Sequence, residues 1–458
     1  MISADKLKQE FAKSPANGVK TIFQEFIHLE ASAGILLLVF TGLALVWANS
    51  PWRDSYFDLW QKTYLTVGVG RWALSKPLIL WINDGLMAIF FFVVGLEIKR
   101  EVLAGELASP RKAALPLAAA LGGIIAPALL YTAVNAGGPG AGGWGVPMAT
   151  DIAFTLGVLA LLGTKAPLPL KIFITALAIV DDIGAVLVIA LFYTAEISWL
   201  ALGIGAGIMV LLIGLNRMQV HSPIPYALLG VGLWLAILYS GMHATIGGVL
   251  VAMTIPARAH ASHRTFVTVA QQALDDYRAT MGDDMVNGIS KRQAATWALE
   301  VASGKAESPL QRLEHSLHPW VIYLIMPVFA LANAGVSFVG SGSGPILASP
   351  VSMGIVVGLA LGKPLGIALM SWLAVRLKLA ELPAGITFRH IVGAGFLAGI
   401  GFTMALFIAN LAFADAELLS AAKIGVLLAS AAAGLLGWLL LYTTPDRAKN
   451  DVPAFVGS

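Results

Sequence analysis

Two adjacent aspartates, Asp181 and Asp182, lie in the middle of the apolar run 175–190, which contains no other charged residue. An ionisable side chain near the centre of a bilayer costs about 3 kcal/mol on insertion scales, so such residues are functional candidates. Two neighbouring carboxylates in a poorly hydrated site repel each other and cannot both ionise as they do in water. A proton or a small monovalent cation relieves this repulsion. Competition of ion and proton for one site is the minimum chemistry of an antiporter, and a purely structural pair is the alternative.

Other apolar runs contain a lysine and a Thr–Asp pair. Lys363 lies within the run 354–372, where an ammonium group needs a carboxylate partner or a lowered pKa. An ion pair with one of the two aspartates satisfies this need, and a lysine that reaches back to the interface is the alternative. Thr150 and Asp151 precede an apolar half-span, which is typical of a helix N-cap inside the membrane. The glycine-interrupted segment 395–404 predicts a second broken span, and one such span in each half of a transporter indicates a binding site.

The remaining ionisable residues near the ends of apolar runs are weaker candidates. Asp84 lies just inside a run, where a structural role at a helix end is the simpler interpretation. His243 can titrate near neutral pH, although a lone histidine near an interface is more often structural. Two segments at the expected cytoplasmic rim would form a pH sensor only if they come together with other titratable groups. Their ionisable residues include Glu97, Arg100, Glu314, His315 and His318.

Twelve apolar segments of the chain are candidate membrane-spanning helices. Of the 458 residues, 58% are hydrophobic and 12% are charged, whereas an average soluble domain has about 25% charged residues. A helix of about 20 apolar residues crosses a hydrocarbon core roughly 30 Å thick. These features predict an all-α polytopic membrane protein. The segments lie near residues 31–49, 78–98, 113–134, 147–163, 170–194, 199–215, 225–240, 243–256, 318–336, 351–375, 390–411 and 421–442.

Lysine and arginine are concentrated in alternate connections between these segments. Neither residue occurs in the connections 135–146, 195–198, 240–242, 337–350 and 412–420. By the positive-inside rule the basic connections face the cytoplasm, so both termini are expected there. The expected organisation is a cytoplasmic segment 1–30, a membrane domain 31–442 and a cytoplasmic tail 443–458.

The connection 50–77 is expected outside the membrane, although it contains four basic residues. Its part 64–75 is rich in residues that favour β-strands around Gly68 and Gly70, which predicts a β-hairpin. A folded hairpin at this place could serve as a subunit contact. A well-solvated loop is the alternative.

The connection 257–316 is a long cytoplasmic insert. Its sequence predicts two helices, 270–281 and 291–303, which are separated by residues 282–284 and Gly288. The paired acidic residues of the insert lack the glycine and carboxylate spacing of an EF-hand loop, so they are expected on solvated helix faces.

Composition also excludes several classes of site. The chain contains no cysteine, which rules out disulfides, iron–sulfur clusters and thiolate metal sites. No basic tract interleaved with aromatic residues suggests a nucleic-acid partner. No cofactor is expected.

Five motifs of this chain resemble those of the NhaA family of bacterial Na⁺/H⁺ antiporters. They occupy residues 81–101, 149–154, 178–184, 362–366 and 399–404, and the resemblance extends from about residue 25 to residue 442. It implies twelve helices with inverted repeats at 113–194 and 351–442. It also implies two discontinuous helices that cross at mid-membrane, around residues 150–151 and 399–401.

The resemblance further implies a role for each candidate residue. Asp182 and Asp181 would bind Na⁺ or Li⁺ in exchange for protons, with Thr150 among the Na⁺ ligands. Lys363 would pair with Asp181, and Thr150 and Asp151 would stabilise the helix crossing. Activation by alkaline pH would be tuned by Glu97, Arg100, His243, Glu314, His315 and His318.

At the level of the whole protein, the resemblance implies electrogenic exchange in the bacterial inner membrane that serves sodium and pH homeostasis. The 50–77 hairpin would mediate a homodimer in the lipid bilayer. The insert departs from the family, because typical members have a much shorter connection before the 312–315 motif.

Three other functions compete with Na⁺/H⁺ antiport. The first two are K⁺/H⁺ antiport and Na⁺-coupled solute uptake, although a solute carrier should need more polar or aromatic recognition groups than these spans contain. The third is an intramembrane aspartyl protease, which needs two aspartates on different helices. The contiguous pair Asp181 and Asp182 argues against a protease.

Overall fold

The chain folds into two compact units in the computed structural model. The first comprises Met1–Asn83, Glu106–Ile189 and Ile322–Ser458, and the second comprises Asp84–Gly105 and Ala190–Val321. The structure describes residues 30–69, 72–194, 197–259, 263–280, 285–337 and 348–444. The predicted segment 1–30 and tail 443–458 therefore lie almost entirely outside the described residues.

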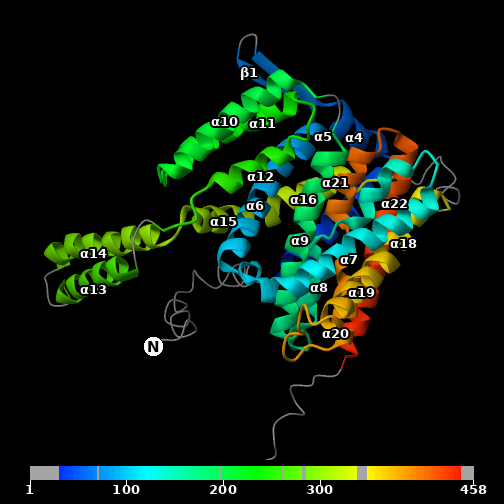
Figure 1. Cartoon of the computed structure of the whole chain (residues 1–458). Helices are drawn as coiled ribbons and strands as arrows, with labels where there is room; N and C mark the ends of the chain where they lie inside the picture. Colours follow the sequence, from blue (N-terminus) through cyan, green and yellow to red (C-terminus); the bar gives the residue numbers. More distant parts are fainter. Residues whose placement is uncertain are drawn as a thin grey trace, which may run out of the picture. The chain divides into compact units, whose positions relative to one another are not determined.

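The first unit contains most of the helices (Figure 1). Its α-helices and strands are α3 (Glu30–Ala48), α4 (Arg53–Phe57), β1 (Tyr64–Val69), β2 (Trp72–Pro77), α5 (Leu78–Leu80), α7 (Pro110–Asn135), α8 (Ile152–Leu161), most of α9 (Leu168–Phe192), α16 (Met326–Asn333), α18 (Pro350–Val357), α19 (Lys363–Arg376), α20 (Phe388–Ala398), α21 (Phe402–Ala412) and α22 (Ala416–Tyr442).

The second unit contains seven of the α-helices among the described residues, together with the end of α9. They are α6 (Met87–Ala104), α10 (Trp199–Arg217), α11 (Pro223–Tyr239), α12 (Thr245–Thr254), α13 (His263–Ala279), α14 (Met285–Ala306) and α15 (Pro309–Trp320). Short 3₁₀ and π-helical stretches connect or interrupt the helices of both units. They are Asp58–Lys62, Trp81–Leu86, Glu106–Ala108, Ala141–Met148, Gly163–Lys165, Val321–Ile325 and Gly358–Gly362.

The apolar helices confirm the predicted fold class. Among the described residues, eight helices are long and apolar enough to cross a membrane, or nine if the bent pair of α20 and α21 forms one span. Three shorter apolar helices, Ser32–Ala48, Pro223–Tyr239 and Thr245–Thr254, complete the set. Each of the twelve predicted segments overlaps one of these helices, so the chain is an all-α polytopic membrane protein with a small hairpin.

Two of the spans are broken near their middle, as the sequence predicts. A 3₁₀ helix, Ala141–Met148, is followed by a non-helical stretch that ends at Asp151, the N-cap of α8. Helices α20 and α21 are separated by residues 399–401 and bend by 47°. A Cβ atom on Gly399 would lie 2.5 Å from the carbonyl oxygen of Leu359, so only glycine permits this close approach.

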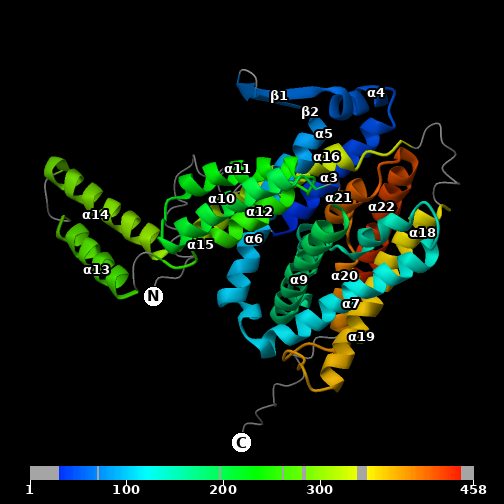
Figure 2. The ribbon, with the colours of Figure 1, turned by 45° about the horizontal axis from the view of Figure 1, so that its top comes forward.

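Helices α7 and α19 lie side by side in both views of the ribbon (Figures 1 and 2). The contact is so close that a Cβ atom on Gly122 would collide with the carbonyl oxygen of Gly366. Small residues allow helix backbones to approach in this way in membranes. The contact fixes α19, and with it Lys363 at its first position.

The predicted β-hairpin is present in the first unit. Strands β1 and β2 are antiparallel, with Thr66 opposite Ser75 and Val67 opposite Leu74. The hydroxyls of Thr66 and Ser75 share a hydrogen bond of 2.8 Å. Residues 70 and 71, which follow β1 in the sequence, lie outside the described residues.

The insert forms the predicted helix pair, with longer helices than the sequence suggests. Helices α13 and α14 lie side by side in Figures 1 and 2. Gly288 lies within α14 rather than in the separation between the helices. This part of the prediction is wrong, because a single glycine costs a helix interior only about 1 kcal/mol. Residues 281–284 lie outside the described residues.

Candidate ion-binding site

The ammonium group of Lys363 forms a buried ion pair with Asp181. Its Nζ lies 2.5 Å from Oδ2 of Asp181, and the side chains of both residues are fully buried. Nζ also donates a hydrogen bond to the carbonyl oxygen of Met148, at the end of the 3₁₀ helix. The expected ion pair is therefore present, and the alternative of a lysine that reaches the interface is wrong.

The carboxylate of Asp181 also accepts a hydrogen bond across the break of the first interrupted span. Oγ1 of Thr150 lies 2.6 Å from Oδ2 of Asp181 and 2.8 Å from the carbonyl oxygen of Ala398. A hydroxyl has one proton, so it donates to only one of these acceptors at a time. Within the described residues, no group donates a hydrogen bond to the buried Oδ1 of Asp181.

Asp182 is the next residue of α9 and is as deeply buried as Asp181, with 1% of its surface exposed. Consecutive helix residues point about 100° apart, so the two carboxylates face different neighbours. The negative charge of Asp182 nevertheless acts on Lys363. When all three groups are ionised, two carboxylates and one ammonium leave the site with one excess negative charge.

Asp151 joins the N-termini of two half-helices. Its Oδ1 accepts a hydrogen bond of 2.9 Å from the backbone N–H of Phe154 and so caps α8. Its Oδ2 accepts from the backbone N–H of Thr403 at 3.0 Å and from the Thr403 hydroxyl at 2.5 Å, at the start of α21. Because helix N-termini carry partial positive charge, one buried carboxylate stabilises both. The predicted N-cap is confirmed.

Residues of the first interrupted span donate hydrogen bonds to the carbonyl oxygens at the C-terminal end of α20. The carbonyl oxygens of Leu397 and Ala398 accept hydrogen bonds from the hydroxyls of Thr155 and Thr150, at 3.0 and 2.8 Å. The backbone N–H of Asp151 donates to the carbonyl oxygen of Ile400 at 2.7 Å. The two breaks therefore complete each other, which is how non-helical backbone is tolerated at membrane depth.

Sequence reasoning missed Thr403 and Thr155 as members of this site. Thr403 stands in the glycine-interrupted segment that predicts the second break, but nothing in that segment indicates its bond to Asp151. A hydroxyl in an apolar run is uncharged and can bond to a carbonyl oxygen of its own helix, so it gives no signal of the kind that identified Asp151.

The hydroxyl of Thr403 should contribute to the stability of the crossing. We expect Thr403→Val to lower the free energy of unfolding by about 1–2 kcal/mol, because the buried Asp151 carboxylate loses one of its donors. Thr403→Ser keeps the donor and should remain close to the parent. Thermal unfolding of the purified protein measures the effect. Thr132→Val is the matched control, since the Thr132 hydroxyl bonds only to its own helix at Ala128, and an equal loss there would contradict the role of Thr403.

Four of the six residues expected to respond to pH come together in the second unit. The guanidinium group of Arg100 donates hydrogen bonds to Glu314 and to Glu101. Nδ1 of His318 lies 3.4 Å from Oε1 of Glu97. In the described part of the chain, no hydrogen bond or ion pair joins His315 or His243 to this group. His315 is exposed on α15, and His243 lies between α11 and α12.

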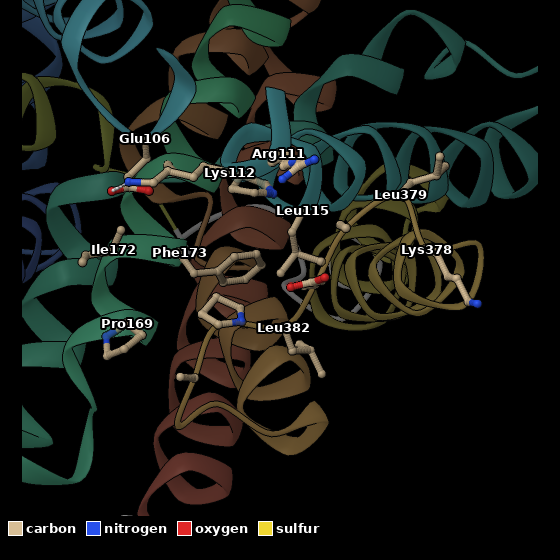
Figure 3. A pocket seen from close by; sticks show the side chains of 16 residues that line it. Glu106, Arg111, Lys112, Leu115, Pro169, Ile172, Phe173, Lys378, Leu379 and Leu382 are labelled. Atoms are coloured by element: carbon tan, nitrogen blue, oxygen red, sulfur yellow. Dashed lines mark hydrogen bonds and ion pairs between the residues drawn. The ribbon is translucent and has the colours of Figure 1, made fainter. Parts of the chain in front are cut away.

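A separate cavity of about 770 Å³ lies at the starts of α7 and α9 and the connection after α19 (Figure 3). Glu106 and Lys112 point toward each other at its edge, with 3.4 Å between Oε1 and Nζ. The cavity contains none of the residues of the aspartate site. Among the described residues, no group of three or more His, Cys, Asp or Glu side chains could hold a resident metal ion.

Together, the broken spans and the buried charges are those of a polytopic membrane transporter. The sequence matches the family described as Na⁺/H⁺ antiporter 1 over residues 24–441. The chain belongs to this family, and it is therefore a transporter and not an enzyme.

Three curated relatives span nearly the same length. The chain is 54% identical over 431 residues to the Na⁺/H⁺ antiporter NhaA of Oleidesulfovibrio alaskensis, which covers 94% of this chain and 95% of the relative. It is 50% identical to the NhaA of Koribacter versatilis, with 94% and 93% covered. It is 49% identical to NhaA 2 of Syntrophotalea carbinolica, with 94% and 98% covered.

Proposed function

We propose that this chain exchanges Na⁺ or Li⁺ for protons across the bacterial inner membrane, through Asp181 and Asp182. The observation that carries the proposal is the buried Lys363–Asp181 ion pair beside Asp182. The site has one negative charge more than its lysine can balance, so it needs either a proton or a cation. The relatives named as Na⁺/H⁺ antiporters support the choice of ions.

Na⁺ and Lys363 compete for the same carboxylate in this mechanism. In the proton-loaded form, the Lys363 ammonium holds Asp181 and a proton occupies Asp182. Na⁺ enters between the two carboxylates and replaces the ammonium on Asp181. The Thr150 hydroxyl then donates to Ala398 and offers an oxygen lone pair to the ion, because both acceptors are already within reach of it.

The same competition makes the exchange electrogenic. A buried ammonium that has lost its carboxylate partner costs several kcal/mol, so Lys363 releases its proton when Na⁺ takes Asp181. Asp182 also releases its proton when its carboxylate binds the same ion. Two protons then leave for each Na⁺ that binds, and one net charge crosses the membrane in each cycle. The proton gradient can therefore drive Na⁺ out of the cell, which serves sodium and pH homeostasis.

The proposed function is tested in everted membrane vesicles from a bacterial host without its own antiporters. Addition of Na⁺ or Li⁺ should dissipate a preformed proton gradient in the absence of any organic substrate, and it should do so faster when a permeant anion or potassium with valinomycin compensates charge. A response to K⁺ alone would favour K⁺/H⁺ exchange. A requirement for an organic solute would favour Na⁺-coupled uptake.

We also propose that the group of Glu97, Arg100, Glu314 and His318 regulates activation by pH. The protonated His318 ring is stabilised by the Glu97 carboxylate. If loss of this proton accompanies activation, Glu97→Gln should move the activation midpoint to lower pH, by up to about one pH unit for the loss of one neighbouring charge. Exchange rate against pH measures the midpoint. His315→Gln is the control, because His315 makes no bond to the group, and an equal shift there would exclude this role for Glu97.

The remaining expectations concern the whole protein. The family resemblance supports inverted repeats at 113–194 and 351–442 and a place in the inner membrane. The distribution of basic residues supports cytoplasmic termini. A homodimer through the 50–77 hairpin is supported by the exposed Leu65 and Val67, because an isolated two-stranded hairpin is only marginally stable in water. A monomeric mass for the purified chain in detergent would contradict this contact.

A further inference from the structure

Helix α14 of the insert has an apolar residue on the side away from its partner. The buried residues of the α13–α14 pair are Ala273, Ala295 and Ala302, and their small side chains let the two helices pack closely. Trp297 lies on another face of α14 and is 68% exposed. A large aromatic residue with two-thirds of its surface in water is an unusual feature of a helix that already has a packed face.

Trp297 belongs to a stripe with a lysine at each end. Residues Lys291, Ala294, Trp297, Val301 and Lys305 follow one another at spacings of three and four, so they are neighbours along one side of the helix. Lys291, Ala294, Trp297 and Lys305 are exposed, and Val301 is half-buried. We call this set the α14 stripe. Its centre is apolar and its ends are cationic.

The chain holds the end of α14 close to the start of a membrane span. Only Glu307 and Ser308 separate α14 from α15, and α15 opens the candidate span Pro309–Asn333. Two residues span at most about 10 Å between the helix ends. The other end of the insert is held at the same place, because the backbone N–H of Leu310 donates to the carbonyl oxygen of Pro256 at 3.2 Å.

We propose that the α14 stripe binds the surface of an anionic phospholipid bilayer, the membrane in which this chain lies. Tryptophan is favoured at the level of the headgroups, where its ring is apolar and its indole N–H remains hydrated. Lysines at the stripe ends reach the phosphate groups while their stems lie along apolar surface. The cationic ends match the negative charge of a cytoplasmic leaflet, and the short connection to α15 keeps the stripe at that surface.

The absence of cysteine from the chain allows a direct test, since one introduced cysteine carries a single fluorescent label. Ala294→Cys places a bimane label on the stripe. Thr296→Cys places the same label on an exposed position about 160° around the helix. The full-length protein is placed in nanodiscs of phosphatidylglycerol and phosphatidylcholine, with and without lipid that carries a nitroxide near the headgroup.

The nitroxide lipid should quench the Ala294 label at least about twofold and leave the Thr296 label almost unchanged, because only a label within the headgroup region meets the quencher. Trp297→Ser in the Ala294→Cys chain should reduce this quenching. Lys291→Gln with Lys305→Gln should reduce it in the anionic nanodiscs, and less in phosphatidylcholine alone. Unchanged Na⁺-dependent exchange or an unchanged elution volume shows that the variants fold.

Three results would overturn the proposal. Equal quenching of both labels by aqueous iodide would place the stripe in water. Protection of the Ala294 label from both iodide and the nitroxide lipid would mean that protein covers it, for example a second copy of the chain. Lipid quenching that is unaffected by Trp297→Ser would show that the stripe does not make the contact.

Discussion

Asp182→Asn is expected to reduce Na⁺-dependent proton movement in everted vesicles at least about 100-fold, since a loss of some 3 kcal/mol in ion binding corresponds to a factor of this size. The replacement keeps the shape of the side chain and removes its charge and its titration. The Lys363–Asp181 pair is then electrically balanced on its own. Na⁺ gains nothing by entering a site with no excess negative charge, and one of the two exchanged protons has no carrier.

Asp415→Asn is the matched control for this variant. Asp415 is an exposed residue at the start of α22, where it accepts hydrogen bonds from Glu417 and Leu418. Asparagine caps a helix about as well as aspartate, so the fold should persist. Exchange should remain at the parental rate in Asp415→Asn. Undiminished exchange in Asp182→Asn would remove Asp182 from the mechanism, whatever the control shows.

The charged members of the site could be predicted from the sequence because charge is costly in an apolar span. Each apolar run of the site contains a single charged residue or one charged pair, namely Asp151, Lys363, or Asp181 with Asp182. The cost of an unpaired ammonium also predicts that Lys363 has a carboxylate partner. The residues alone leave the choice between the two aspartates open, because it depends on how α9 and α19 are rotated toward each other. The family resemblance, not the spacing, pointed to Asp181.

The hydroxyl groups of the site could not be predicted in the same way. Thr403 and Asp151 are 252 positions apart in the chain, and their bond exists only because two half-helices meet end to end. Thr150 is the exception, since its position next to Asp151 is typical of the start of a helix. The residues expected to respond to pH show the same limit of sequence-based prediction. The contacts bring together Glu97, Arg100, Glu314 and His318, whereas the exposed His315 has no hydrogen bond or ion pair to any of them among the described residues. Sequence spacing does not distinguish the two outcomes.

The spans were predictable because their apolar composition is a local property. The interruptions of the spans were only partly predictable. Gly399 and Asp151 give local signals for the two breaks. The π-helical stretches Gly358–Gly362 and Val321–Ile325 have weaker ones, since Pro364 and Pro327 each lack the N–H that would bond to a carbonyl oxygen within them. Gly288 shows the reverse error, because its helix is held by packing between α13 and α14 that outweighs one unfavourable residue.

Lys363→Met is expected to destabilise the protein by about 3–5 kcal/mol, since removal of one partner leaves a buried charge uncompensated. Methionine fills a similar volume, so the loss reports charge rather than a cavity. Asp181 would keep only the Thr150 hydroxyl as a donor among the described residues. The loss should shrink at acid pH, where a proton on Asp181 can replace the ammonium, and should grow as the pH rises. Thermal unfolding of the purified protein across this range measures both effects.

The double variant Lys363→Met with Asp181→Asn separates this electrostatic effect from a loss of packing. It removes both charges together, so it should recover most of the stability and lose most of the dependence on pH, while Na⁺ exchange stays absent. Lys423→Met is the control, because Lys423 lies half-buried within α22 and makes no ion pair with any described residue. Its effect should be small. If the double variant is as unstable as Lys363→Met alone, the lysine stabilises the crossing through its bond to the Met148 carbonyl instead, and competition between Na⁺ and Lys363 for Asp181 would lose its structural basis.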